Sequence, residues 1–238
     1  MNHHSNCGML MITVLVLPIV LLQQTCGLNE ISVLVLSQRN KYHWGEAEHL
    51  KHSIIEQSLS LDDGRKPNVY LSHEVFDKTN AWPITPVLID ILNQLIKPQT
   101  RWLVVCEASS NVNWRKLLIN LSNEDDLSEV YLGFPLFDRD ATIIHHFAFF
   151  HNPSSFHYPY IRAGVAFSIP LLNRLVFWSD GRFFRRPLTD FSIDAAHEMA
   201  LFMWNVDNNL ILKTVPYFCS YYGSDCAIYA KEESIFCL

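Results

Sequence analysis

Four short runs of apolar and β-branched residues predict strands in the N-terminal half of the chain. They are Ile31–Ser37, Asn68–Ser72, Trp102–Cys106 and Val130–Gly133. The first and third runs are apolar at nearly every position, which is typical of strands in a parallel sheet whose two faces are both buried.

Segments with helical spacing lie between these strands. From Glu46 to Leu59, apolar residues recur at near-helical spacing with charged residues between them. Further helices are predicted at Ile84–Ile96, where prolines flank both ends, and at Val112–Leu121. The alternation of strand and helix favours an α/β sheet with right-handed crossovers.

The pattern is less regular in the C-terminal half. Phe147–Tyr160 is rich in aromatic residues and histidine and contains two prolines, so we predict a long ordered loop. A helix is expected at Asp194–Val206 and a late strand at Ile211–Phe218. No internal repeat or linker is visible, so the sequence predicts one α/β domain with an irregular C-terminal end.

The N-terminal segment has the character of a targeting signal. Residues 1–27 contain no Lys, Arg, Asp or Glu, and a near-continuous apolar run extends from Gly8 to Leu22. The small residues Thr25 and Gly27 follow it. We predict a signal peptide at 1–27 and the domain at 28–238, with an uncleaved anchor or a buried element as the alternatives.

Cysteine usage fits a secretory compartment. Beyond the predicted signal, four cysteines remain, and an even number in an oxidising compartment predicts disulfides. Their connectivity is open, but three of them lie close to the C-terminus, so we expect that segment to be cross-linked. A zinc site is not favoured, because no C-x2–4-C pair is present. The four residues are Cys106, Cys219, Cys226 and Cys237.

Composition and a short motif agree with this compartment. Residues Asn120–Ser122 form an Asn-x-Ser sequon, which predicts glycosylation at Asn120. The chain of 238 residues is 49% hydrophobic with a net charge of −6, a globular profile. No basic excess favours a nucleic-acid partner.

Several ordered motifs resemble one known family. The third predicted strand ends in Glu107-Ala108-Ser109, and a helix with a Leu-Leu pair follows it. Tyr131–Gly133, Tyr160–Leu171 and Leu188–Asp194 come next, in that order. This order and spacing resemble the Fringe-like glycosyltransferases of family 31, and the resemblance implies a GT-A-like (Rossmann-like), mostly parallel sheet flanked by helices.

The resemblance is closest to members that extend O-linked fucose. It involves Ala141–Ala148, Tyr158-Pro159, Asp190–Asp194 and the C-terminal cysteines. It implies the N-terminal domain of a two-domain enzyme, in which the second domain carries the chemistry. It further implies UDP-glucose as donor, Mn²⁺ as cofactor, and fucose on thrombospondin type 1 repeats as acceptor.

The resemblance also assigns site residues. Glu107 and Ser109 stand at the acidic triplet that holds the donor and its metal, with Glu107 as the metal ligand, and Asp190 stands at the position of the catalytic base. A single carboxylate is a poor cradle for a divalent cation, so Glu107 is alternatively a strand-end acid bonded to a loop. Asp190 is alternatively the N-cap of the following helix.

Aromatic and histidine residues offer further candidates. A sugar-stacking platform is one hypothesis for four aromatic side chains, with core packing favoured for Trp102. His145 and His146 are adjacent in sequence and would point to opposite faces of a strand, so a shared metal ion is disfavoured. His197-Glu198 lacks the spacing of a zinc protease. The four aromatic residues are Trp82, Trp102, Tyr158 and Tyr160.

Three functions remain open from the sequence. The first is a weakly active or non-catalytic glycosyltransferase domain that supports substrate recognition, together with a second catalytic domain. The second is an active UDP-sugar-dependent hexosyltransferase that uses Asp190. The third is a lumenal binding module for Cys-rich repeats or glycans. The expected location is the endoplasmic reticulum lumen, with secretion as the alternative.

Overall fold

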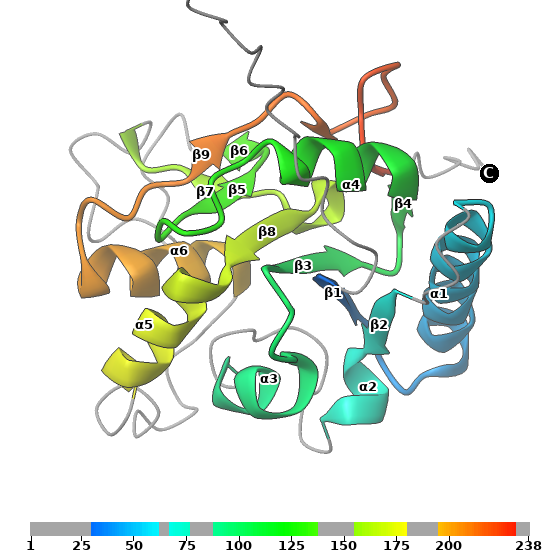
Figure 1. Cartoon of the computed structure of the whole chain (residues 1–238), viewed down its shortest axis with the longest axis horizontal. Coiled ribbons are helices and arrows are strands. Elements are labelled where there is room, and N and C mark those ends of the chain that lie inside the picture. The colour runs from blue at the N-terminus through cyan, green and yellow to red at the C-terminus, as the bar shows by residue number, and fades with distance from the viewer. Residues whose placement is uncertain (1–29, 62–66, 77–87, 138–154, 180–194, 232–238) are drawn as a thin grey trace, which may run out of the picture.

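The computed structural model describes residues 30–61, 67–76, 88–137, 155–179 and 195–231. Its centre is a six-stranded sheet in the order β2-β1-β3-β8-β5-β9, flanked by helices (Figure 1). The strands are β1 (Ile31–Leu36), β2 (Asn68–Leu71), β3 (Trp102–Glu107), β5 (Tyr131–Gly133), β8 (Val165–Ser168) and β9 (Lys213–Thr214).

The sheet is mostly parallel, as predicted. β1 pairs in parallel with β2 and β3, and β5 pairs in parallel with β9. β8 lies between β3 and β5 and runs antiparallel to both. The predicted α/β class is confirmed, while β8 is a strand that the hydrophobic pattern did not indicate.

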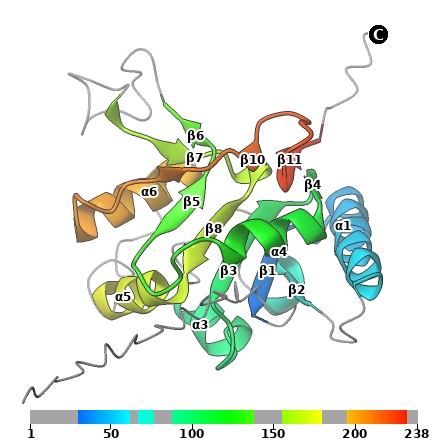
Figure 2. The same cartoon turned by 45° about the horizontal axis from the view of Figure 1, so that its top comes forward.

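Helices cover both faces of this sheet. They are α1 (Lys41–Leu59), α2 (Ser72–Val75), α3 (Leu88–Leu95), α4 (Trp114–Ser122), α5 (Ile169–Ser179) and α6 (Ala195–Val206), with a short 3₁₀ turn, η3 (Ile161–Ala163). Buried residues of α1 and α4 share one core cluster, and those of α3, α5 and α6 share the other. Figure 2 shows that α1 and α4 are separated in space from α5 and α6.

Alternating side chains of the central strands supply both core clusters. In β1, Val33 and Val35 pack with α1 and α4, whereas Leu34 and Leu36 pack on the opposite side. Because successive side chains of a strand point to opposite faces, a strand that is apolar at nearly every position needs cover on both sides. The helices on the two faces meet this need.

Two smaller sheets lie beside the main one. β4 (Ser110–Val112), β11 (Ile228–Ala230) and β10 (Phe218–Cys219) form a three-stranded sheet, and β6 (Pro135–Leu136) pairs with β7 (Tyr158–Pro159). β11 is antiparallel to β4, which attaches the C-terminal segment to the residues that follow β3. This attachment positions the candidate site.

Some element boundaries differ from the predictions. The helix expected to begin at Val112 begins at Trp114, because the side chain of Asn113 accepts a hydrogen bond from the Lys116 amide and caps the helix. The late strand expected at Ile211–Phe218 is divided into β9 and β10, with Pro216 between them. Within the predicted loop at Phe147–Tyr160, the described residues include β7.

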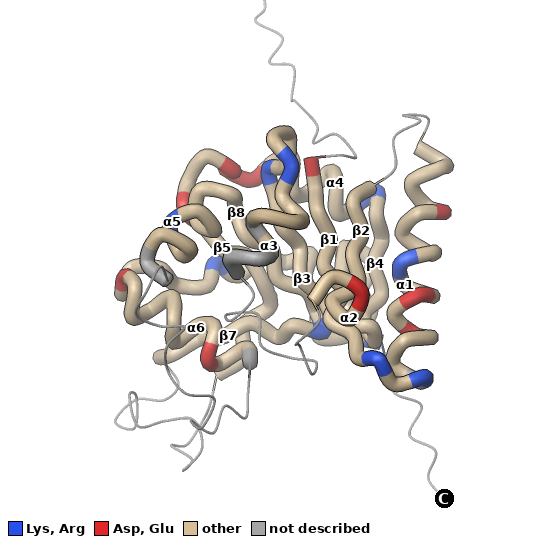
Figure 3. The backbone as a smooth tube through the Cα atoms, turned by 90° about the horizontal axis from the view of Figure 1, so that it is seen from below, with Lys and Arg blue, Asp and Glu red and all other residues tan. Residues whose placement is uncertain are grey.

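Charged residues of both signs are distributed along α1 (Figure 3). None of the helices that the structure describes is long and apolar enough to cross a membrane. The predicted signal peptide at 1–27 lies outside the described residues, so it stays a prediction.

Candidate functional site

The turn after β3 is held by contacts from distant parts of the chain. The amide of Ala108 donates to the carbonyl of Leu36 at 3.3 Å, and the amide of Glu107 donates to Ser110 Oγ at 3.1 Å. Ser110 Oγ in turn donates to the carbonyl of Arg162 at 2.8 Å. The end of β3 is therefore fixed relative to β1, β4 and η3.

Glu107 and Ser109 come together at this turn, and Arg162 joins them. Arg162 Nε donates to Ser109 Oγ at 3.0 Å and lies 3.9 Å from Glu107 Oε2. Ser109 Oγ lies 3.5 Å from the same carboxylate oxygen. The side chains of Arg162 and Glu107 are only 23% and 19% exposed. This Glu107–Ser109–Arg162 cluster thus has partly desolvated charges of opposite sign.

Among the residues that the structure describes, this cluster does not fit a divalent metal. Mn²⁺ and Mg²⁺ favour several hard oxygen ligands, with carboxylates to balance their charge. Glu107 is one carboxylate, and the guanidinium beside it carries charge of the same sign as a metal ion. No group of three or more His, Cys, Asp or Glu side chains suited to a metal occurs among the described residues. Asp190, the predicted base, lies outside them.

The other aromatic and histidine candidates are mainly structural. Trp102 is fully buried in β3, and Tyr158 is buried in the core, while Tyr160 is half-buried with its ring 6.5 Å from Phe134. His197 is buried, with ring centroids 5.1 Å from Phe156 and 5.2 Å from Tyr158. Trp82, His145 and His146 lie outside the described residues.

The cysteines only partly follow the prediction. Cys219 and Cys226 form a disulfide, which confirms the cross-linked C-terminal segment. Cys106, expected to be in a disulfide, is instead a free thiol that is fully buried in β3. Its side chain packs in the core shared with α1 and α4, so it behaves as a small hydrophobic residue. Cys237 lies outside the described residues.

Asn120 lies on α4 and is half-buried. Its Nδ2 donates to the carbonyl of Lys116 at 2.9 Å, within the same helix. The predicted glycosylation at this position remains a prediction.

The Cys106 thiol should be unreactive in the folded protein. Burial raises its pKa from 9.0 to about 12. The unfolded thiol ionises near pH 9 and the folded one does not, so this group's contribution to stability is complete below pH 9 and is lost between about pH 9 and pH 12. We expect iodoacetamide at pH 9 to leave Cys106 unmodified, and peptide mass spectrometry measures the extent of labelling. Rapid native labelling would contradict this, and the same sample in guanidinium is the labelling control.

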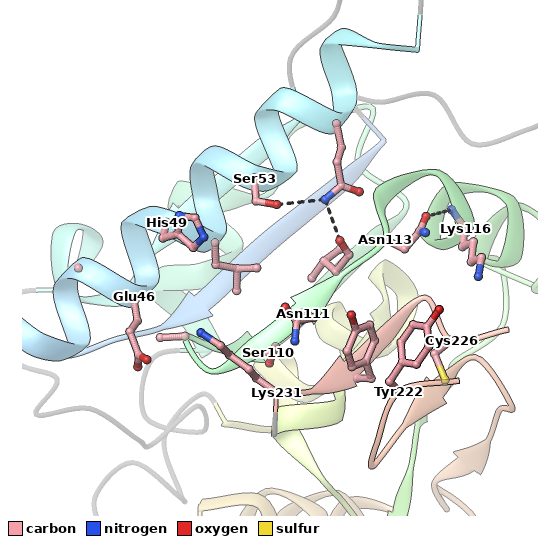
Figure 4. Close-up of a pocket in the computed structure, with 16 residues that line it drawn as sticks. Glu46, His49, Ser53, Ser110, Asn111, Asn113, Lys116, Tyr222, Cys226 and Lys231 are labelled. Atoms are coloured by element: carbon pink, nitrogen blue, oxygen red, sulfur yellow. Dashed lines mark hydrogen bonds between the residues drawn. The ribbon is translucent and has the colours of Figure 1, made fainter. Parts of the chain in front are cut away.

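A cavity of about 680 Å³ lies next to the turn, on the face covered by α1 and α4. Its wall residues come from α1, from β4 and the start of α4, and from the C-terminal segment that carries the disulfide. In Figure 4, His49 and Glu46 extend from α1, Asn111 from β4, and Tyr222 and Lys231 from the opposite wall. Sequence patterns did not indicate this cavity, because its residues come from three distant segments.

Comparison with curated proteins finds relatives of one kind. No protein-family model matches the chain. β-1,3-Glucosyltransferase of Mus musculus is 36% identical to the chain over 193 residues, and that of Homo sapiens is 37% identical over 193 residues. The alignment covers 81% of this chain but 38% of each relative, so the chain spans less than two fifths of the length of the curated relatives it matches.

Among solved structures, the chain is similar to 4-diphosphocytidyl-2C-methyl-D-erythritol synthase from Anaerococcus prevotii. The TM-score is 0.43 at 13% identity, over 79% of this chain and 89% of that one, a likeness too low to support a conclusion. The α/β assignment rests on the observed sheet order instead. The sequence homology confirms the predicted resemblance: this chain is similar to β-1,3-glucosyltransferases over 81% of its length.

Proposed function

We propose that this chain is a glycosyltransferase domain that supports substrate recognition in the extension of O-linked fucose, with little or no catalysis of its own. The donor of the complete system is UDP-glucose, the acceptor is a fucosylated thrombospondin type 1 repeat, and a second domain carries the transfer. The homology to β-1,3-glucosyltransferases supports the glucosyltransferase role.

The observation that carries the non-catalytic role is the ion pair at the strand end. A pyrophosphate leaving group needs concentrated positive charge, which a metal held by carboxylates supplies in metal-dependent enzymes. Here the carboxylate of Glu107 already faces the guanidinium of Arg162 at 3.9 Å. A metal ion at Glu107 would have to displace Arg162 from Glu107 and Ser109. It would gain only the carboxylate of Glu107 as a negatively charged ligand from this cluster.

A lumenal location is part of the proposal. The Cys219–Cys226 disulfide supports an oxidising compartment, because such bonds are rare in the cytosol. We place the protein in the endoplasmic reticulum lumen, where fucosylated repeats would meet it.

The test is turnover and binding with purified protein. We expect no transfer from UDP-glucose to a fucosylated repeat with Mn²⁺ present, and calorimetric binding of the repeat that EDTA does not alter. Arg162→Ala should not create Mn²⁺-dependent transfer, because Glu107 would remain the one carboxylate that the described residues place in this cluster. Arg115→Ala, an exposed arginine on α4, is the matched control.

Two results would overturn the proposal. Mn²⁺-dependent transfer by the unmodified chain would show that the strand end is an active metal site. Failure to bind the fucosylated repeat would remove the recognition role.

A further inference from the structure

The cavity beside α1 is distinct from the strand-end cluster. Neither Glu107, Ser109 nor Arg162 lines it, although Ala108 and Ser110 of the same turn do. Its volume of about 680 Å³ lies within the range of small-molecule sites. The described parts of the chain therefore offer a second place for a ligand, with chemistry of its own.

Part of the cavity wall is already occupied by internal hydrogen bonds. Gln57 Nε2 donates to Ser53 Oγ at 3.2 Å and to the carbonyl of Val112 at 2.8 Å, and its Oε1 accepts from the amide of Trp114 at 2.9 Å. This glutamine ties α1 to β4 and α4, so the wall is rigid there. Its amide is not available to a ligand.

The positive groups at the start of α4 are likewise engaged. The amide of Lys116 donates to Asn113 Oδ1, and Lys116 Nζ donates to the carbonyl of Ser224. The amide of Asn113 donates to the carbonyl of Ala227 at 2.7 Å. A helix N-terminus attracts phosphate through unsatisfied amides, and the amides of Asn113, Trp114 and Lys116 are satisfied within the protein. The cavity is therefore poorly suited to a nucleotide diphosphate.

Other side chains of the wall are open to a ligand. Asn111, His49, Tyr222 and Tyr229 make no side-chain hydrogen bond to another part of the chain that the structure describes. They offer an amide, an imidazole and two phenol groups, which both donate and accept. The rings of Tyr222 and Tyr229 lie 5.3 Å apart in an edge-to-face arrangement, and they add apolar surface to one wall.

We infer that this cavity binds a neutral sugar ring. A pyranose has apolar C–H faces, suited to tyrosine rings, and a rim of hydroxyl groups, suited to neutral donors and acceptors. A charged ligand would find Glu46 and Lys231 of opposite sign on facing walls (Figure 4). The inference rests on the proposed function, since a domain that recognises a glycosylated acceptor needs a place for its sugar.

The test is saturation-transfer NMR with the purified chain and methyl glycosides of fucose, glucose, galactose, mannose and N-acetylglucosamine. We expect saturable binding of at least one glycoside. Tyr222→Ala should weaken it by about tenfold or more, a loss of about 1.4 kcal/mol. Tyr221→Ala is the matched control, because Tyr221 and Tyr222 are 70% and 67% exposed and only Tyr222 lines the cavity.

A second variant guards against indirect effects. Asn111→Ala should also weaken glycoside binding, while UDP should not compete with the bound glycoside. The inference is overturned if no glycoside binds, if Tyr221→Ala and Tyr222→Ala weaken binding equally, or if UDP displaces the sugar.

The two proposals fail separately. If the chain binds the fucosylated repeat but no methyl glycoside, the cavity inference is wrong and the recognition role stands. If a glycoside binds in the cavity but the repeat does not bind, the sugar site stands and the recognition role is wrong.

Discussion

Trp102→Ala is expected to lower the free energy of unfolding by about 3–5 kcal/mol, the usual cost of removing a large aromatic side chain from a core. Trp102 is fully buried in the third strand of the main sheet, and its ring belongs to the core covered by α1 and α4. Urea denaturation gives the measurement. Unfolding is followed by circular dichroism of the backbone and not by tryptophan fluorescence, because the substitution removes a tryptophan.

Trp102→Phe is the matched control. The indole Nε1 of Trp102 has no hydrogen-bond partner within the described structure, so phenylalanine removes a buried donor that costs about 1–3 kcal/mol when unsatisfied. This gain offsets part of the lost packing, and the phenylalanine variant should be clearly more stable than the alanine variant. A loss below about 1 kcal/mol for Trp102→Ala would contradict the core role and revive the sugar-platform hypothesis for this residue.

Gly164→Ala is expected to lower the free energy of unfolding by about 2–6 kcal/mol. Gly164 has φ of +86°, a conformation that costs about 1–3 kcal/mol for other residues. An added Cβ would also lie 2.8 Å from Ile228 Cδ1 and 3.1 Å from Ile228 Cγ2, and overpacking costs about 1–3 kcal/mol more. The same urea titration measures the loss.

Gly45→Ala serves as its control. Gly45 lies inside α1, and an added Cβ there would meet no heavy atom within 4 Å. Alanine should therefore stabilise the helix by about 0.5–1 kcal/mol. Equal effects of the two substitutions would contradict the positive φ and the close contact at Gly164.

The sequence predicts the central strands well for a physical reason. β1 and β3 are buried on both faces, so they are apolar at nearly every position and stand out from their surroundings. β8 was missed because it leads directly into α5 at Ile169, and only Ser168 separates the apolar strand from the apolar start of the helix. β4 was missed because its three residues carry no periodicity of their own.

The candidate site is predictable only within one segment. The proximity of Glu107 and Ser109 follows from their sequence separation, whereas the pairing with Arg162 depends on β8 lying next to β3. The sequence signal that could have indicated this pairing is Arg162, a basic residue just before Ala163-Gly164 and the start of β8. Counting cysteines similarly failed for Cys106, because an even number does not reveal that a thiol is buried inside a strand.

The hydrogen bonds of the turn at residues 108–110 have a kinetic consequence. Ser110 bonds to Arg162, 52 residues away, and the amide of Lys231 donates to the carbonyl of Ser109 at 2.9 Å. Closing such long loops costs entropy before any contact compensates for it, so contacts of this range slow folding. During synthesis, the turn at 108–110 therefore lacks these partners until Arg162 and Lys231 have left the ribosome, and the pairing of β4 with β11 must form late.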